Sequence, residues 1–355
     1  MPSKRGEKPL DPAFIIAGRL RRDYLLPPAR AITGTTTPLR PLIDVPGGNL
    51  LYAASGLSVW APLRPAIGLL ARIGEDYPQD WLRSFEERGW DTRGIHILAE
   101  TLDLRYFQAS LPGLILQHSN PVAHFARLGL PFPKSLLGYQ PSGETDDNRK
   151  TSPPASPRPN EIPANYLNAR AAHICPLDFM TGNRLTSAFR EASVTTLTLD
   201  PSAAYMTSTS VDDVRILVHG LTAFLPSEEE LRTLFWGRTD DLWQMAEAVG
   251  AFGCEFVVIK RGVRGQILYD TVSKKRWEVP AYSASLVDPT GAGDAFCGGF
   301  LAGYQKTYDP LQGVLYGSVS ASLAIEGSGA FHALDALPGL AQRRLESLAA
   351  IVRQV

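Results

Sequence analysis

The chain has 355 residues, of which 44% are hydrophobic and 20% charged, so it can form one large α/β domain or two smaller ones. Its 35 Lys and Arg residues nearly balance its 36 Asp and Glu residues, so the net charge gives no strong positive field that would attract nucleic acid or an anionic membrane. The three cysteines lie far apart without a CxxC pair, which argues against a zinc site and a disulfide framework. Residues 1–12 lack the apolar core of a secretory signal, and no apolar run approaches a membrane span. We therefore expect a cytoplasmic protein that binds neither nucleic acid nor a membrane.

Short apolar runs alternate with helical patterns along most of the chain. The sequence predicts strands over 14–17, 67–72, 194–199, 255–260, 267–269 and 276–279. It predicts helices over 47–60, 77–89, 242–253, 295–304 and 311–326, and an extended, β-prone segment over 282–287. This alternation favours an α/β fold with a mostly parallel sheet covered by helices on both faces. We expect a single domain over 13–355 after a polar tail at 1–12.

One segment differs in composition from the rest. Residues 131–163 contain eight prolines with Ser, Thr, Asp and Asn between them, a composition that resists regular structure. Because strand and helix patterns resume on both sides, we interpret the segment as a mobile surface insertion within the domain. A true domain boundary is the alternative.

The most informative stretch is Asp-Pro-Thr-Gly-Ala-Gly-Asp at residues 288–294, followed by small and apolar residues that suit a buried helix. Gly291 and Gly293 allow a tight turn that brings bare N–H groups to the start of this helix. Unpaired amides and the helix dipole both favour an anion there. Asp294 lies in the same turn, where a carboxylate is either a helix cap or a chemical base.

The chain contains no Walker phosphate loop, no dinucleotide-binding G-x-G-x-x-G after the first strand, and no protein-kinase or hydrolase motif. Residues 288–299 instead resemble the C-terminal signature of the PfkB (ribokinase-like) carbohydrate kinase family. The resemblance implies a ribokinase-like fold with a small β lid. It also implies that Gly291, Ala292 and Gly293 form an anion hole for the phosphoryl group, and that Asp294 takes the proton from the substrate hydroxyl.

Two further blocks resemble the substrate side of this family. Gly18 to Asp23 is similar to the family's G-x-x-x-x-D, which implies that Asp23 accepts hydrogen bonds from substrate hydroxyls; a solvated turn aspartate is the alternative. Gly47 to Ala54 is similar to G-G-x-x-x-N-x-A, which implies that substrate lies against Gly47 and Gly48. Tyr52 replaces the family's Asn, so the usual sugar contacts and any specific substrate are in doubt.

The nucleotide side is matched by other blocks. Ser227 to Glu230 resembles the family's N-x-x-E, which implies an indirect role of Glu230 in binding Mg²⁺, although Ser-x-x-Glu is also a capping box. Residues 260–265 resemble K-x-G-x-x-G, which implies that Lys260, Gly262 and Gly265 lie beside the ATP phosphates. The small-residue helix and loop over 317–329, with Ser318, resemble the wall beside the adenine. In some family members, the positions of Asp288 and Thr290 also hold a monovalent cation such as K⁺.

The matched blocks run from about residue 14 to residue 332. Segments 19–45 and 96–118 match the family's lid, with lid strands expected at 104–107 and 114–116, and the resemblance also admits a homodimer through this lid. We expect an ATP- and Mg²⁺-dependent kinase that phosphorylates a hydroxyl of a small-molecule sugar or related polyol. The alternatives are a nucleoside kinase of the same family, with Tyr52 stacking on the base, and a non-catalytic relative that binds sugar or nucleotide and regulates a partner.

Overall fold

The computed structural model of the chain describes residues 11–26, 40–60, 67–111, 115–141, 147, 149, 151–192 and 194–355. Part of the expected tail (1–10), part of the first lid segment (27–39) and Leu114 lie outside the described residues. Residues 142–146, 148 and 150 of the expected insertion also lie outside them.

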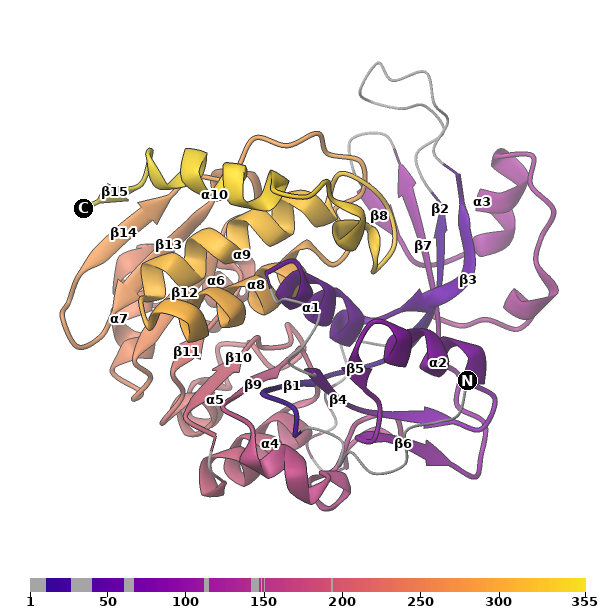
Figure 1. The fold of residues 1–355 in the computed structure, drawn as a ribbon, viewed down its shortest axis with the longest axis horizontal. Coiled ribbons are helices and arrows are strands. Elements are labelled where there is room, and N and C mark those ends of the chain that lie inside the picture. Colours follow the sequence, from indigo (N-terminus) through magenta and orange to yellow (C-terminus); the bar gives the residue numbers. More distant parts are fainter. Residues whose placement is uncertain are drawn as a thin grey trace, which may run out of the picture.

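A large sheet forms the centre of the molecule (Figure 1). Its order is β15-β14-β13-β12-β11-β10-β9-β1-β4-β5, with β6 also paired to β4. All pairs from β12 to β5 are parallel, and the pairs from β12 to β15 are antiparallel. The strands are β1 Phe14–Ala17, β4 Ile67–Gly74, β5 Trp90–Asp91, β6 Ile95–Leu98, β9 Ala171–Ile174, β10 Thr196–Leu199, β11 Ala223–Phe224, β12 Phe256–Lys260, β13 Gln266–Asp270, β14 Arg276–Val279 and β15 Arg353–Gln354.

Helices cover both faces of this sheet, and its central strands are therefore buried on both sides. One face packs against α4 Phe179–Glu191, α5 Val211–Val218, α6 Glu228–Leu234 and α7 Leu242–Gly250. The other face packs against α1 Asn49–Ser58, α2 Gln79–Glu87, α8 Ala292–Thr307, α9 Pro310–Ala324 and α10 Leu340–Ala349. The prediction of a mostly parallel α/β sheet is thus confirmed. None of the helices in the described ranges is long and apolar enough to cross a membrane.

A second, smaller sheet has the order β3-β2-β7-β8 and lies at the right of Figure 1. It contains the two strands expected in the lid, with somewhat different bounds. Asp23 lies in its second strand, opposite Val45 on one side and Tyr106 on the other. Its elements are β2 Arg21–Leu26, β3 Leu42–Gly47, β7 Arg105–Leu111 and β8 Ile115–Gln117, with α3 Pro121–Arg127 following.

Helices α1 and α8 cross with their backbones in contact. A Cβ atom at Gly298 of α8 would lie 1.8 Å from the carbonyl oxygen of Ala53, and one at Gly56 of α1 would lie 2.1 Å from that of Ala295. Only hydrogen fits at either position, so the small residues expected in these two helices serve close packing.

Two expectations about irregular segments need correction. The β-prone segment 282–287 forms no strand; instead the Val287 amide bonds to the carbonyl of Ile325 (2.8 Å), which ties the segment to the end of α9. The proline-rich insertion has little regular structure, but part of its described range is buried against the domain rather than lying at the surface. Ser156 is fully buried and donates to Asp178 (2.7 Å), and Glu161 pairs with the buried Arg72 of β4 (3.1 Å). Whether the chain counts as one domain with an insertion stays a prediction.

Candidate active site

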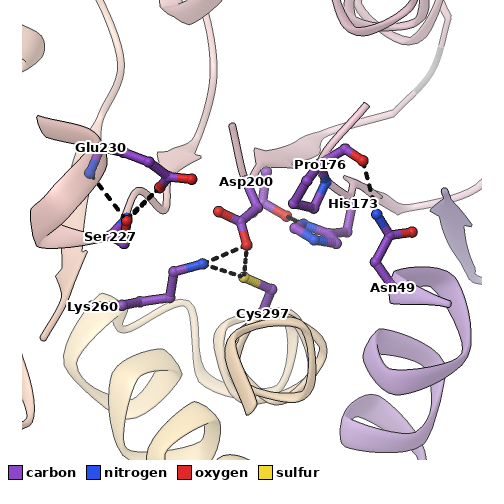
Figure 2. A network of polar contacts seen from close by, with 9 residues as sticks. Asn49, His173, Pro176, Asp200, Ser227, Glu230, Lys260 and Cys297 are labelled. Carbon is purple, nitrogen blue, oxygen red and sulfur yellow. Dashed lines mark hydrogen bonds and ion pairs between the residues drawn. The ribbon is translucent and has the colours of Figure 1, made fainter. Parts of the chain in front are cut away.

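Several functional side chains meet where the parallel strands end and α8 begins. β10 is followed directly by Asp200, and β12 ends at Lys260. Because parallel strands with crossover helices place their carboxyl ends at one edge of the sheet, residues distant in sequence meet there. Figure 2 shows Lys260, Asp200 and Cys297 in contact at this edge, with Ser227 and Glu230 beside them.

The glycine turn before α8 has a geometry that only glycine tolerates without strain. Gly291 is the N-cap residue of α8 and has a φ of 72°. A Cβ atom there would lie 2.0 Å from Cδ1 of Tyr52, so the tyrosine ring packs directly against the turn. Of the three residues expected to form the anion hole, Ala292 already donates its amide to the carbonyl of Pro289 (3.2 Å).

Asp294 lies in the first turn of α8 and keeps partial exposure to solvent. The alternative that it caps the helix is wrong, because the N-cap residue is Gly291 and no side-chain cap hydrogen bond forms. Burial raises the pKa of Asp294 from 3.8 to about 6, although the cations Lys260 and Arg21 lower it. The carboxylate is therefore more basic than an ordinary aspartate and still ionised at neutral pH.

Asp23 lies against the backbone of Gly47, where a Cβ atom would be 1.8 Å from its Oδ2 atom. The side chain is 2% exposed, and its Oδ1 atom has no hydrogen-bond partner among the described residues. Burial raises the pKa of Asp23 to about 7; Arg21 lowers it and Asp288 raises it. Gly48 follows as the N-cap residue of α1. A buried carboxylate oxygen without a partner is what a binding site for a hydroxyl donor requires.

Tyr52 is 4% exposed, and its hydroxyl also lacks a partner within the described ranges. Burial raises the pKa of Tyr52 well above its ordinary value, and the nearby carboxylates of Asp23, Asp288 and Asp294 raise it further. The Tyr52 ring therefore lies near both Asp23 of the small sheet and Asp294 of α8. Because Gly291 covers the ring closely, that face cannot stack on a nucleobase.

A chain of hydrogen bonds joins the small sheet to the glycine turn. Tyr106 donates to Oε1 of Gln108 (3.2 Å), and Gln108 donates to Oγ1 of Thr290. Thr290 donates its amide to Oδ1 of Asp288 (3.0 Å) and its hydroxyl to the same oxygen. Sequence reasoning missed Gln108, since no motif marks it and its role depends on the packing of β7 against the turn.

Lys260 forms an ion pair with Oδ2 of Asp200, which is 3% exposed. Its ammonium also lies near α8, because a Cβ atom at Gly293 would be 3.4 Å from Nζ. Sequence reasoning missed Asp200. The signal was available, since this carboxylate directly follows a buried strand at the edge of the sheet where ligands bind in open α/β folds.

The capping-box interpretation of residues 227–230 is confirmed. Glu230 donates its amide to Oγ of Ser227 (3.2 Å), and Ser227 donates its amide to Oε2 of Glu230 (2.7 Å). Burial raises the pKa of Glu230 to about 7; Asp200 raises it and Lys260 lowers it. The carboxylate thus lies within electrostatic range of Lys260, and its role toward Mg²⁺ stays a prediction.

The remaining nucleotide-side residues lie around the β12–β13 turn and α9. Gly262, two residues after Lys260, begins a short 3₁₀ turn, and Gly265 follows this turn. Ser318 of α9 is 4% exposed, and its hydroxyl contacts Oε1 of Gln266 (2.6 Å) and the carbonyl of Val314 (2.8 Å). The hydroxyl is thus engaged within the protein, and a contact of Ser318 with nucleotide stays a prediction.

The described part of the chain holds no cluster of three or more His, Cys, Asp or Glu side chains that could bind a metal ion. The guanidinium of Arg21 lies 4.3 Å from the ring centre of Tyr106. The arrangement therefore combines carboxylates on the small-sheet side with an ammonium and a helix start on the other.

Comparisons with known proteins agree with this geometry. A model of the pfkB family of carbohydrate kinases matches residues 164–337. A cytidine kinase of Thermococcus kodakarensis is 29% identical over 265 residues, which cover 74% of this chain and 82% of that protein. Two solved structures are each 16% identical to the chain. A putative ribokinase II of E. coli with ATP and Mg²⁺ has a TM-score of 0.67, and the match covers 96% of this chain and 99% of that one. The nucleoside kinase of Burkholderia thailandensis with inosine has a TM-score of 0.66, and the match covers 94% of this chain and 96% of that one. At this identity they show a shared ribokinase-like fold.

Proposed function

Because the chain belongs to the PfkB family of carbohydrate kinases and is therefore a phosphotransferase, we propose that it phosphorylates a hydroxymethyl oxygen of a sugar or related polyol with ATP. One observation carries this proposal. Asp294 is ionised at neutral pH, partly exposed and free of any helix-capping bond, and it lies at the start of a helix near the Lys260 ammonium. A base and an anion site in one turn are what phosphoryl transfer to an alcohol requires.

In the proposed reaction, Asp294 accepts the proton of the acceptor hydroxyl while that oxygen attacks the γ-phosphorus of ATP in line. A pKa of about 6 keeps the carboxylate ionised at pH 7 and more basic than an ordinary aspartate. The start of α8, with Gly291, Ala292 and Gly293, stabilises the charge on the transferred group. Asp23 accepts hydrogen bonds from other hydroxyls of the acceptor and so orients it against Gly47 and Gly48.

Mg²⁺ bound to the phosphates would neutralise the charge that develops as the bond to the leaving oxygen breaks. Lys260 neutralises part of the phosphate charge from the protein side, and Glu230 is the carboxylate that we propose acts on Mg²⁺ through water. For K⁺, both hydrogen bonds from Thr290 reach Oδ1 of Asp288, so we propose the Oδ2 atom as the cation ligand. A cytoplasmic location and a homodimer through the small sheet stay predictions.

A nucleoside acceptor is the second candidate, and the similarity to a cytidine kinase over 74% of the chain favours it. Tyr52 cannot supply the stacking surface on the side that Gly291 covers. Tyr106 is a second aromatic side chain near Asp23, since it lies opposite Asp23 in the small sheet and is only half-buried, although the Arg21 guanidinium lies 4.3 Å from its ring centre. Assaying ATP consumption with a panel of sugars, inositols and nucleosides separates the two candidates.

The proposed mechanism is tested by Asp294→Asn, with Asp212→Asn as a control because that side chain is exposed. We expect Asp294→Asn to lower kcat by at least ~10²-fold, as loss of a general base does, and to leave ATP binding by calorimetry nearly unchanged. The control should behave like the native enzyme. Near-native turnover of Asp294→Asn would remove the base from the mechanism. If the native protein binds ATP or sugars but turns over no acceptor, the non-catalytic alternative is favoured instead.

A further inference from the structure

Asp200 has a buried position that none of the family motifs explains. It follows β10, whereas Lys260 ends β12, and β11 separates the two strands in the sheet. The two side chains nevertheless reach each other and form an ion pair, although the Lys260 side chain keeps 13% of its surface exposed. Figure 2 shows the Lys260 ammonium held between Asp200 and Cys297. The thiol Sγ lies 3.4 Å from Oδ2 of Asp200 and 3.8 Å from Nζ of Lys260.

The Lys260 ammonium lies close to the first turn of α8. A Cβ atom at Gly293 would be 3.4 Å from Nζ, and Cys297 lies one turn further along the same helix. Lys260 lowers the pKa of Asp294, which shows that the ammonium is within electrostatic reach of the proposed base. The ammonium therefore has Glu230 and Asp294 within electrostatic reach besides its direct partner Asp200, at the place where the phosphate of ATP is expected.

The charges around this ammonium are unequal. Three carboxylates, on Asp200, Glu230 and Asp294, share the positive charge of Lys260. Burial alone lowers the pKa of Lys260, but Asp200, Cys297 and Glu230 raise it above its ordinary value, so the amine stays charged. His173 of β9 adds no charge at neutral pH, because burial and Lys260 lower its pKa to about 3.

We propose that Asp200 is a positioning residue that holds the Lys260 ammonium at the start of α8 and keeps it from pairing with Asp294. This proposal rests on the proposed function. Without Asp200, the ammonium loses its direct partner, and Asp294 in the neighbouring turn of α8 becomes an available anion. Pairing there would draw the ammonium away from the incoming phosphate and make Asp294 a weaker base. Asp200 thereby supports both phosphate binding by Lys260 and proton acceptance by Asp294 without touching either substrate.

The test is Asp200→Asn, which keeps the shape of the side chain and removes its charge. We expect kcat to fall by about 10- to 100-fold, a loss within the range measured when a positioned group is misplaced. We also expect the acid limb of the kcat–pH profile to move to lower pH, because loss of a nearby negative charge and a closer ammonium both lower the pKa of Asp294. An unchanged acid limb contradicts the proposal, because it would show that the Lys260 ammonium has not moved towards Asp294.

A double-mutant cycle with Lys260→Met isolates the pair. If Asp200 acts through Lys260, adding Asp200→Asn to Lys260→Met lowers kcat no further. Equal losses in both backgrounds overturn the proposal. The same comparison keeps the test valid should Asp200→Asn alone fail to fold because it leaves a buried charge unpaired, since the double variant removes both charges.

A binding measurement separates this proposal from the proposed function. Calorimetry with ATP needs no turnover, and we expect Asp200→Asn to weaken ATP binding severalfold in the native background but not in Lys260→Met. If no acceptor is phosphorylated yet this pattern holds, the proposed function fails and the positioning role stands. If Asp200→Asn has the same effect on ATP binding with and without Lys260, the positioning role fails.

Discussion

Replacing Gly291 by alanine tests the contact between the glycine turn and Tyr52. The residue has a φ of 72°, a conformation that costs an alanine roughly 1–2 kcal/mol. The new Cβ atom would also lie 2.0 Å from Cδ1 and 2.1 Å from Cγ of the buried tyrosine ring, an overlap that typically costs about 1–3 kcal/mol. Together these effects predict a loss of roughly 2–5 kcal/mol in the free energy of unfolding.

Gly262→Ala is a matched control, because Gly262 has a φ of 56° but a Cβ atom there would meet nothing within 4 Å. We expect this control to lose only the backbone cost, roughly 1–2 kcal/mol. Urea unfolding followed by circular dichroism measures both values. In a Tyr52→Ala background, the cost of Gly291→Ala should fall to that of the control. The reasoning is refuted if Gly291→Ala and Gly262→Ala destabilise the native protein equally.

Three further predictions follow from the charges and caps of the site. The kcat–pH profile should decline below about pH 6, because the protonated form of Asp294 cannot accept a proton; a flat profile to pH 4.5 contradicts this. Asp23 has a pKa of about 7 when folded and 3.8 ordinarily, so its buried charge costs stability above pH 7 and nothing below pH 3.8. Asp23→Asn should therefore raise the free energy of unfolding at pH 8 by up to about 4 kcal/mol, with the gain disappearing towards pH 4. Ser227→Ala should lose about 1 kcal/mol in urea unfolding through its cap, and an unchanged midpoint would contradict the capping box.

The sequence predicted the elements in which apolar residues recur at a regular spacing, and it predicted the glycine turn of the 288–294 motif. The strand at 14–17 has the expected bounds, and a helix does begin at the glycine turn, at Ala292. These succeed because strand burial and a glycine turn are local properties of a few neighbouring residues. The helix at 179–191 and the short strand at 223–224 were missed, since their apolar patterns are weak and their stability comes from packing.

The contacts that complete the site could not be predicted from local patterns. Gln108 reaches Thr290 across 182 positions in the chain, and Lys260 reaches Asp200 across 60. Such pairs depend on how strands are ordered in the sheet and on how the small sheet meets the turn. The segment 282–287 shows the converse, because its β-prone residues bond to the end of α9 instead of to a strand. Tertiary contacts overrode the local preference.

The backbone contact between α1 and α8 ties together two parts of the enzyme that evolution or engineering would otherwise adjust separately. Tyr52, which packs against the glycine turn, belongs to α1, and Asp294, the proposed base, belongs to α8, yet the crossing leaves no room for either helix to slide. A substitution beside Tyr52 that makes room for a bulkier acceptor should therefore also shift Asp294, the proposed base. Variants selected for a new substrate should accumulate compensating changes at the contact between α1 and α8.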